Sequence, residues 1–261
     1  MRHIVWILLA TCVSLVAEPH YINGGPHANR DTVIIFIHGY TESSKAWGDL
    51  PNRIATDPQI ESFADVFMFD YPRRRQVPQI AQVDLESQVH RRTIGDGKRN
   101  IVFVCHSLGG VIAWQTIWYM QGDQTTSRPF KMVFTYGTPY KGSDVLVEYL
   151  RPWVDSQILA AEVAERNPYL TALLDKWKSS SWMKGIDAYC AYEGKKLPVK
   201  EFGSLINVQV VSEDSATAIC NQPHIKIDAD HNQMIQVPDA FIQLKRALLE
   251  SETKWAPVST K

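Results

Sequence analysis

The chain has 261 residues, of which 45% are hydrophobic, and it carries 27 Lys and Arg against 28 Asp and Glu. This length suits one globular domain, because a chain of this size buries enough apolar surface for a single large core. A formal net charge of −1 creates no field that would gather polyanions, which argues against nucleic acid as the main partner. Four Cys residues are too few for a cystine framework, although they leave room for one bridge.

The first residues predict a cleaved signal peptide over residues 1–17. Arg2 precedes an apolar run from Ile4 to Ala17, and polar residues follow it. The run is shorter than the roughly 18 to 20 residues that a membrane-spanning helix needs, and Ala17 is small enough for a cleavage site. We therefore expect residues 18–261 to form a secreted or otherwise extracytoplasmic domain. The alternatives are an N-terminal membrane anchor and a buried first strand.

Beyond this leader, apolar segments alternate with helical patterns, which predicts an α/β fold with a mostly parallel, doubly wound sheet. The expected strands are almost continuously apolar, as strands buried on both faces are. They cover residues 33–37, 64–69, 101–105, 132–136, 186–192, 206–211 and 225–227. The expected helices cover residues 47–54, 80–93, 108–120 and 239–249.

Residues 142–181 interrupt this alternation, because they are mostly helical in pattern and rich in aromatic side chains. We interpret this stretch as a lid insertion, since such insertions beside a site often act as a lid or a substrate wall. Trp153, Tyr169, Trp177 and Trp182 belong to it. Their simplest role is packing in the core, and their number favours an apolar substrate slightly.

The most informative motif surrounds Ser107, which lies between an expected buried strand and an expected helix. A nucleophile on such a turn is held in a strained conformation, so the positions two before and two after it must be small. Gly109 and Gly110 meet this need after Ser107, and Cys105 stands at the position before it. The strand, turn and helix together predict that Ser107 is a catalytic nucleophile.

The expected strand at residues 33–37 runs into His38, Gly39 and Tyr40. In sites with this kind of turn, the oxyanion is bound by the backbone N–H after the nucleophile and by another in this loop. The backbone N–H groups of Leu108 and Tyr40 are therefore the predicted oxyanion hole. We interpret His38 as a structural histidine bonded to loop backbone, because a better base exists.

That base is His231, which follows the last short strand. Its place late in the chain fits the order of serine, acid and histidine, and a parallel sheet brings its loop to the edge that carries Ser107. The competing interpretation is a metal site made of His231 with His224, Asp228 and Asp230. It is disfavoured because no ordered ligand spacing recurs elsewhere, so we expect neither a metal nor a cofactor.

The acid that orients His231 has two candidates. Glu193 ends the expected strand at residues 186–192, while Asp214 follows the next expected strand. Asp214 has a structural alternative as the cap of a short helix at residues 215–219, and Glu193 as an exposed turn residue. We favour Glu193, because a carboxylate is needed beside the histidine to hold its tautomer, and keep Asp214 as the alternative.

These motifs together resemble the α/β-hydrolase superfamily, and within it the lipase-like serine hydrolases related to serine-active-site-containing proteins and GPI inositol deacylases. Beyond the motif at Ser107, the resemblance rests on His38-Gly39 with Trp47, Gly137-Thr138-Pro139 with Gly142-Ser143, Tyr192-Glu193, Val210-Val211 with Ser215-Ala216, and Ala229-Asp230-His231. Two positions depart from the family pattern. Tyr140 stands where histidine is common, and Cys105 where glycine is usual. The chain lacks room for the first two strands of the full fold, so we expect a compact version of it.

The expected chemistry is hydrolysis of carboxylic esters of lipids or other apolar acyl groups, through an acyl-enzyme on Ser107. His231 would take the Ser107 proton, and the predicted oxyanion hole would stabilise the tetrahedral intermediate. One alternative is a thioesterase or amidase that uses the same residues. Another is a catalytically inactive module that holds a lipid or a protein partner in the same pocket.

Five arginines are a candidate contact with anionic lipid head groups at a membrane surface, although a solvated face is the simpler interpretation. They are Arg73, Arg74, Arg75, Arg91 and Arg92.

The four cysteines separate into distinct roles. Cys12 lies in the expected leader, and Cys105 packs beside the nucleophile. Cys190 and Cys220 remain as the candidate bridge, which would form if the protein is exported.

Overall fold

The structure is a computed structural model that describes residues 19–40, 43–71, 76–120, 129–150, 163–181, 183–201 and 204–255. The expected signal peptide, the arginines at positions 73–75 and two of the aromatic lid residues, Trp153 and Trp182, lie outside the described residues. None of the described helices is both long enough and apolar enough to cross a membrane.

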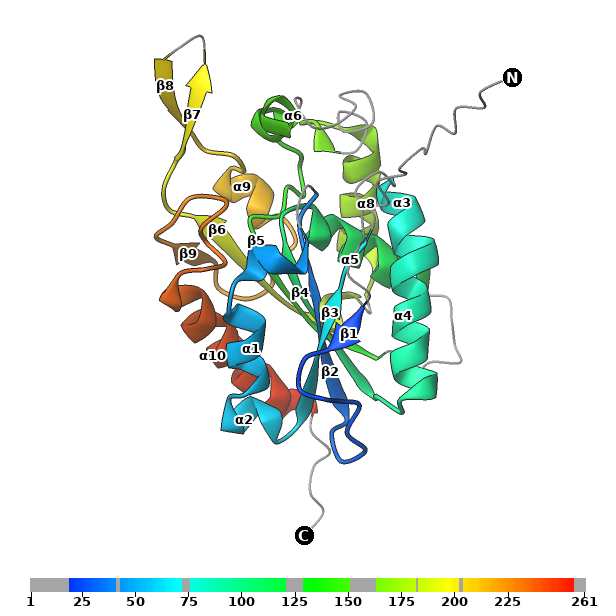
Figure 1. Cartoon of the computed structure of the whole chain (residues 1–261). Coiled ribbons are helices and arrows are strands. Elements are labelled where there is room, and N and C mark those ends of the chain that lie inside the picture. Colours follow the sequence, from blue (N-terminus) through cyan, green and yellow to red (C-terminus); the bar gives the residue numbers. More distant parts are fainter. Residues whose placement is uncertain are drawn as a thin grey trace, which may run out of the picture.

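A seven-stranded sheet runs through the described part of the chain (Figure 1). Its strands are β1 (His20–Tyr21), β2 (Thr32–Ile37), β3 (Ala64–Phe69), β4 (Asn100–His106), β5 (Phe130–Tyr136), β6 (Asp187–Glu193) and β9 (Ile225–Ile227), in the order β1-β3-β2-β4-β5-β6-β9. Every neighbouring pair is parallel except β1 and β3. The predicted fold class is therefore confirmed. The strand order reverses between β2 and β4, and ligands of such sheets bind at the carboxyl ends beside that reversal.

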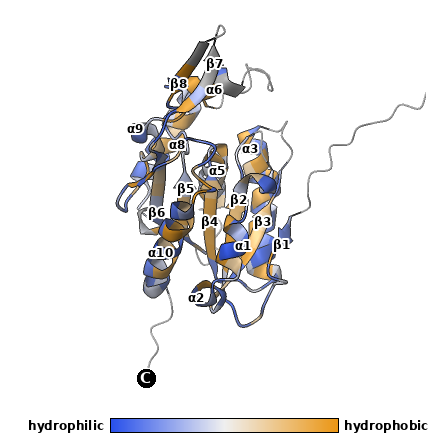
Figure 2. Ribbon diagram, turned by 60° about the vertical axis from the view of Figure 1, so that its left-hand side comes forward, coloured by the Kyte–Doolittle hydropathy of each residue, from blue (hydrophilic) through white to orange (hydrophobic). Residues whose placement is uncertain are grey.

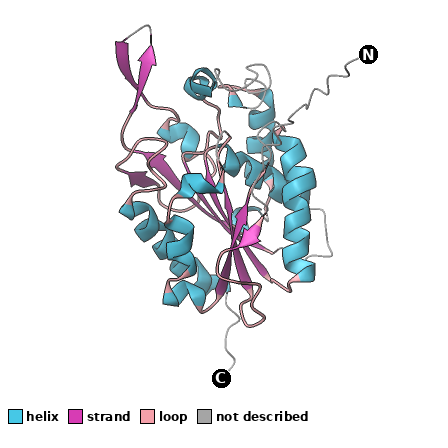
Figure 3. Ribbon diagram, viewed as in Figure 1, coloured by secondary structure: helices cyan, strands magenta, loops and turns pink. Residues whose placement is uncertain are grey.

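Helices cover both faces of the sheet (Figures 1 and 3). One face carries α1 (Leu50–Ala55), α2 (Pro58–Glu61) and α10 (Pro238–Trp255). The other carries α5 (Leu108–Met120), α8 (Pro168–Ser179) and a continuous helical run made of α3 (Val77–Gln79), η2 (Ile80–Leu85), α4 (Glu86–His90) and η3 (Arg91–Gly95). A short turn of helix, η1 (Ser44–Trp47), precedes α1.

The core has two layers because side chains alternate across each strand. In β2, Ile34 and Phe36 join the layer under α1 and α10, while Val33, Ile35 and Ile37 join the layer under α5. Figure 2 shows the resulting hydrophobic strands between the helices. A sheet buried on both faces explains why the sequence reads as continuous apolar runs.

The prediction that residues 206–211 form a strand of this sheet is wrong. Residues 204–208 instead belong to β8 (Ser204–Val208), which pairs antiparallel with β7 (Leu197–Glu201), and the two strands project from the molecule in Figure 1. The two strands are close neighbours in sequence, so they pair with each other at little cost in chain entropy. Val210 and Val211 then turn back into the protein and are buried.

The predicted helical insertion is helical where it is described. α6 (Asp144–Leu150) and α8 belong to it, and η4 (Met183–Gly185) follows it before β6. Trp177 of α8 is buried against Trp114 of α5, with ring centroids 6.2 Å apart. Trp177 therefore packs in the core, which is the simpler of the two roles expected for it.

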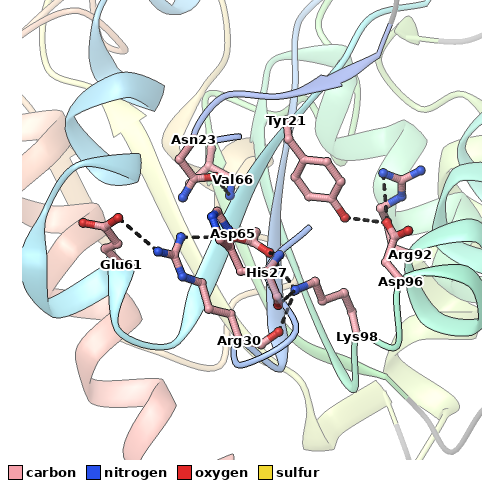
Figure 4. Close-up of polar contacts among 10 residues, drawn as sticks. All are labelled: Tyr21, Asn23, His27, Arg30, Glu61, Asp65, Val66, Arg92, Asp96 and Lys98. Carbon is pink, nitrogen blue, oxygen red and sulfur yellow. Dashed lines mark hydrogen bonds and ion pairs between the residues drawn. The ribbon is translucent and has the colours of Figure 1, made fainter. Parts of the chain in front are cut away.

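A buried cluster of charges fastens the segment before β2 to the sheet (Figure 4). The Asp65 carboxylate, in β3, lies 2.6 Å from both Lys98 Nζ and His27 Nδ1 and 3.1 Å from Arg30 Nη1. Burial alone would raise the pKa of Asp65, but hydrogen bonds from Lys98 and His27 outweigh this effect and lower the pKa below its ordinary value. Asp65 is therefore an ionised anchor for residues 27–30.

A disulfide joins Cys190 in β6 to Cys220, with Cα atoms 5.9 Å apart. These are the two cysteines that the sequence leaves as the candidate bridge. Cys105 is buried and unpaired, and burial raises the pKa of its thiol well above the ordinary value, so the thiol stays protonated.

Candidate active site

Ser107 occupies the sharp turn between β4 and α5. Its φ is +50°, a left-handed conformation that a residue other than glycine rarely adopts. The turn is held from both sides: the Ser107 N–H donates to the Tyr136 carbonyl at 2.8 Å, and its carbonyl accepts from Thr138 Oγ1 at 2.9 Å. The hydroxyl is thereby presented at the carboxyl end of β4, beside the reversal in strand order.

Close backbone contact requires a glycine at position 109. A Cβ on Gly109 would lie 2.4 Å from the Ile37 carbonyl oxygen, so only glycine lets α5 approach the end of β2. Cys105, two residues before Ser107, is fully buried in the core layer under α5. Position 105, which is usually glycine in α/β-hydrolases, thus accommodates the small thiol side chain of cysteine.

His231 faces Ser107 from the loop after β9. Its Nε2 lies 3.1 Å from Ser107 Oγ, and its side chain is almost fully buried. His106 Nε2 donates to the His231 carbonyl at 2.9 Å, so the residue before the serine fixes the backbone of the histidine. Sequence reasoning assigned no role to His106, because this contact joins residues 125 positions apart.

Glu193 lies on the other side of the His231 ring. Its Oε1 is 3.4 Å from His231 Nδ1, and its side chain is fully buried at the end of β6. The same carboxylate accepts the backbone N–H of Val211 at 2.6 Å and that of Val210 at 3.2 Å. The buried carboxylate is thus fixed by backbone donors and points at the imidazole.

Asp214, the alternative acid, lies apart from this group. Its side chain is 79% exposed and forms an ion pair with Lys141 at 2.6 Å. The prediction that Asp214 caps a short helix is wrong, because α9 (Glu213–Ala216) is capped by Ser212, whose side chain accepts the Ser215 N–H. The structure therefore brings together Ser107, His231 and Glu193, and leaves Asp214 outside.

The two residues of the predicted oxyanion hole follow the ends of two adjacent strands. Leu108 is the first residue of α5, and Tyr40 follows β2, whose end adjoins that of β4. Tyr71 OH donates to the carbonyls of His38 and Gly39 at 2.8 and 3.0 Å, which fixes the loop that carries Tyr40.

His38 belongs to the support of this loop. Its Nδ1 donates to the Gly39 carbonyl at 2.7 Å, and its ring stacks on Tyr71 at 4.2 Å between centroids. The predicted bond to loop backbone is confirmed. Asp70 Oδ1 accepts the Ser44 N–H at 2.7 Å, so the far end of the loop is fastened as well.

The residues of the competing metal site are spread over separate contacts. His224 faces Glu213 at 3.7 Å, Asp228 pairs with Lys195 at 3.0 Å, and Asp230 accepts backbone N–H groups that follow it. Within the described ranges, no three His, Cys, Asp or Glu side chains cluster in a way that could hold a metal ion.

Comparison with known proteins places this geometry in context. A model of the family described as "Alpha/beta hydrolase family" matches residues 34–218, which is more than half of the chain. A search of curated proteins found no match.

Many solved structures share the fold at low sequence identity. Lipase BlEst2 from Bacillus licheniformis, in its mature form, is 16% identical with a TM-score of 0.61, over 89% of this chain and 98% of that one. Esterase Pf2001 from Pyrococcus furiosus is 15% identical with a TM-score of 0.55, over 92% and 85%. Phospholipase PlaB from Legionella pneumophila is 14% identical with a TM-score of 0.58, and the match spans 85% of this chain but only 63% of PlaB.

Proposed function

The chain belongs to the alpha/beta hydrolase family, and on that premise we propose that it is a serine hydrolase of carboxylic esters. The observation that carries the proposal is the alignment of three buried side chains. Ser107 Oγ lies 3.1 Å from His231 Nε2, and His231 Nδ1 lies 3.4 Å from Glu193. A nucleophile, a base and an orienting carboxylate in this order are the requirement for acyl transfer.

In the proposed mechanism, His231 removes the Ser107 proton as Oγ attacks the ester carbonyl. Glu193 holds the Nδ1–H tautomer and stabilises the imidazolium that forms. The N–H groups of Leu108 and Tyr40 bind the oxyanion, and His231 then protonates the leaving alcohol. A water molecule, activated by His231, releases the acyl group in the second half of the reaction.

We propose lipids or other apolar esters as the substrate class. Support comes from fold neighbours that are named lipase, phospholipase and esterase. Within the family, the motif at residues 137–143 supports a place near the serine-active-site-containing and GPI inositol deacylase-like lipases. Peripheral contact with a membrane would follow from such a substrate.

We also propose an extracytoplasmic location. The Cys190–Cys220 bridge supports it, because disulfides persist mainly in oxidising compartments. The apolar run after Arg2 supports it independently as a signal peptide.

The decisive experiment compares the wild type with Ser107→Ala. We expect the variant to lose at least about 10⁴-fold in kcat for a short p-nitrophenyl ester, because the nucleophile is removed. Labelling by a fluorophosphonate probe should disappear in parallel. Matched oxygen-ester, thioester and amide substrates then separate an esterase from a thioesterase or an amidase. Undiminished labelling of Ser107→Ala, or an unreactive folded wild type, would overturn the proposal.

A further inference from the structure

Ser143 stands at the foot of the helical insertion, between the loop after β5 and α6. It is buried, and its backbone N–H donates to the Val163 carbonyl at 2.7 Å, which ties the start of the insertion to its middle. Its hydroxyl donates to the carbonyl of Val210 and accepts the N–H of Leu146 at 3.0 Å. Ser143 therefore links the insertion to the segment that follows the β7–β8 hairpin.

The Val210 carbonyl belongs to the same peptide group as the Val211 N–H. That N–H donates to Glu193 Oε1 at 2.6 Å, and the same oxygen lies 3.4 Å from His231 Nδ1. One side of this peptide is thus held by Ser143, and the other side holds the carboxylate. A hydrogen bond accepted by a peptide carbonyl also polarises its N–H, which strengthens the bond that the N–H donates.

We propose that Ser143 is a positioning residue for Glu193, acting through the Val210–Val211 peptide. The inference rests on the proposed function, in which Glu193 orients His231. The chain of contacts runs from the Ser143 hydroxyl through one peptide group to the carboxylate, and from there across the imidazole to Ser107. Removing the hydroxyl leaves the buried Val210 carbonyl without this donor and frees the peptide that fixes Glu193.

A double-mutant cycle tests whether Ser143 acts through Glu193. We expect Ser143→Ala to lower kcat/KM for a p-nitrophenyl ester about tenfold, and to have less than about a twofold effect in a Glu193→Gln background. Ser143→Thr keeps the hydroxyl and should restore most of the activity. An equal loss in both backgrounds, or no loss in either, would overturn the proposal. If the alanine variant does not fold, Ser143→Cys keeps the volume and weakens the donor.

Ser215→Ala is the matched control. The Ser215 hydroxyl donates to the Gly142 carbonyl at 2.9 Å and accepts the Lys141 N–H at 3.0 Å, so it also supports the foot of the insertion. Neither of these two bonds involves the Val210–Val211 peptide. Any loss that Ser215→Ala causes should therefore be the same in the wild type and in the Glu193→Gln background.

A second measurement does not depend on turnover. The NMR chemical shift of the His231 Nδ1 proton depends on how close the Glu193 carboxylate lies to Nδ1, which is 3.4 Å from Oε1. We expect Ser143→Ala to move this signal to higher field. The shift should be absent in Ser215→Ala. If the wild type hydrolyses no ester, the proposed function fails, while this signal still decides the role of Ser143. An unchanged signal in Ser143→Ala would overturn the positioning role alone.

Discussion

The imidazole of His231 is confined by residues that come from distant parts of the chain. His106 fixes its carbonyl, Glu193 lies against Nδ1, and Gly137 leaves the space in which the ring sits. Close packing of this kind controls reactivity, because a base displaced by about 1 Å from its nucleophile can lose about 100-fold in rate. The residues that touch His231 are therefore sensitive points of the site.

Gly137→Ala should inactivate the protein while leaving it folded. The added Cβ would lie 2.9 Å from His231 Nδ1, and the φ of +58° at this position disfavours any side chain. We expect kcat/KM to fall about 100-fold, with a stability loss of about 1 kcal/mol. Enzyme kinetics and urea unfolding measure the two effects. Gly185→Ala is the control, because its Cβ would meet no atom within 4 Å. Wild-type activity in Gly137→Ala would contradict the geometry.

Tyr71→Phe tests the support of the predicted oxyanion loop. The substitution removes the hydroxyl that donates to the His38 and Gly39 carbonyls and leaves the ring stack on His38 intact. Because the loop carries Tyr40, the second predicted oxyanion donor, we expect kcat to fall about tenfold with little change in KM. Tyr119→Phe, at an exposed position, should have no effect. A change confined to KM would place the effect of Tyr71 on substrate binding instead.

The three residues of the candidate site could be predicted from the sequence, whereas the residues that hold them in place could not. Ser107 is recognisable from the local pattern of strand, turn and small residues, and His231 from its place after the last short strand of a parallel sheet. Glu193 is preferred over Asp214 because the histidine needs a carboxylate beside it to hold its tautomer, and the structure brings Glu193 to the imidazole. The contact of His106 with His231 joins distant residues, so no local pattern could have predicted it.

At the scale of elements, the main strands follow directly from apolar runs because each is buried on both faces. The apolar run at residues 206–211 led to a wrong strand prediction, because apolar residues also occur in a hairpin and in the turn that follows it. β8 pairs with β7 instead of joining the sheet, and only Val210 and Val211 enter the protein. The segment around His27 carries no strong pattern, since a two-residue edge strand and one buried carboxylate hold it.

Asp65→Asn should loosen that segment and lower the free energy of unfolding at neutral pH by about 3 kcal/mol, because buried Lys98 loses its counterion. The pKa of Asp65 lies below its ordinary value, so the carboxylate stabilises the fold above that value. This contribution is lost as the pH falls through the pKa of the folded state. The stability difference between wild type and variant should therefore shrink from about pH 5 to about pH 2.

Urea unfolding at several pH values measures this difference. Asp31→Asn is the control, because Asp31 pairs with Arg99 at the surface and such pairs contribute little to stability. A difference between wild type and Asp65→Asn that stays constant down to the lowest pH would show that the charge of Asp65 is not what stabilises the segment.

On the scale of the whole molecule, the reversal of strand order between β2 and β4 determines where the site forms. The loops after these strands carry Tyr40 and Ser107, and later strands bring Glu193 and His231 to the same edge. The Cys190–Cys220 bridge fastens this late part of the chain, because it ties β6, which ends at Glu193, to the segment after α9. The bridge therefore stabilises both the fold and the strand that positions Glu193.

Removing the bridge should destabilise the protein without removing its chemistry. Cys190 and Cys220 are 30 residues apart, and closing a loop of that length stabilises a fold by about 3 to 4 kcal/mol in the chain-entropy treatment. We expect the double variant Cys190→Ser with Cys220→Ser to lose about 3 to 4 kcal/mol in the free energy of unfolding, measured in urea. A reducing agent should destabilise the wild type but not this double variant. Cys105→Ala should keep the response to reductant. A denatured protein cleaved after the leader should show one free thiol, whereas three would contradict the bridge.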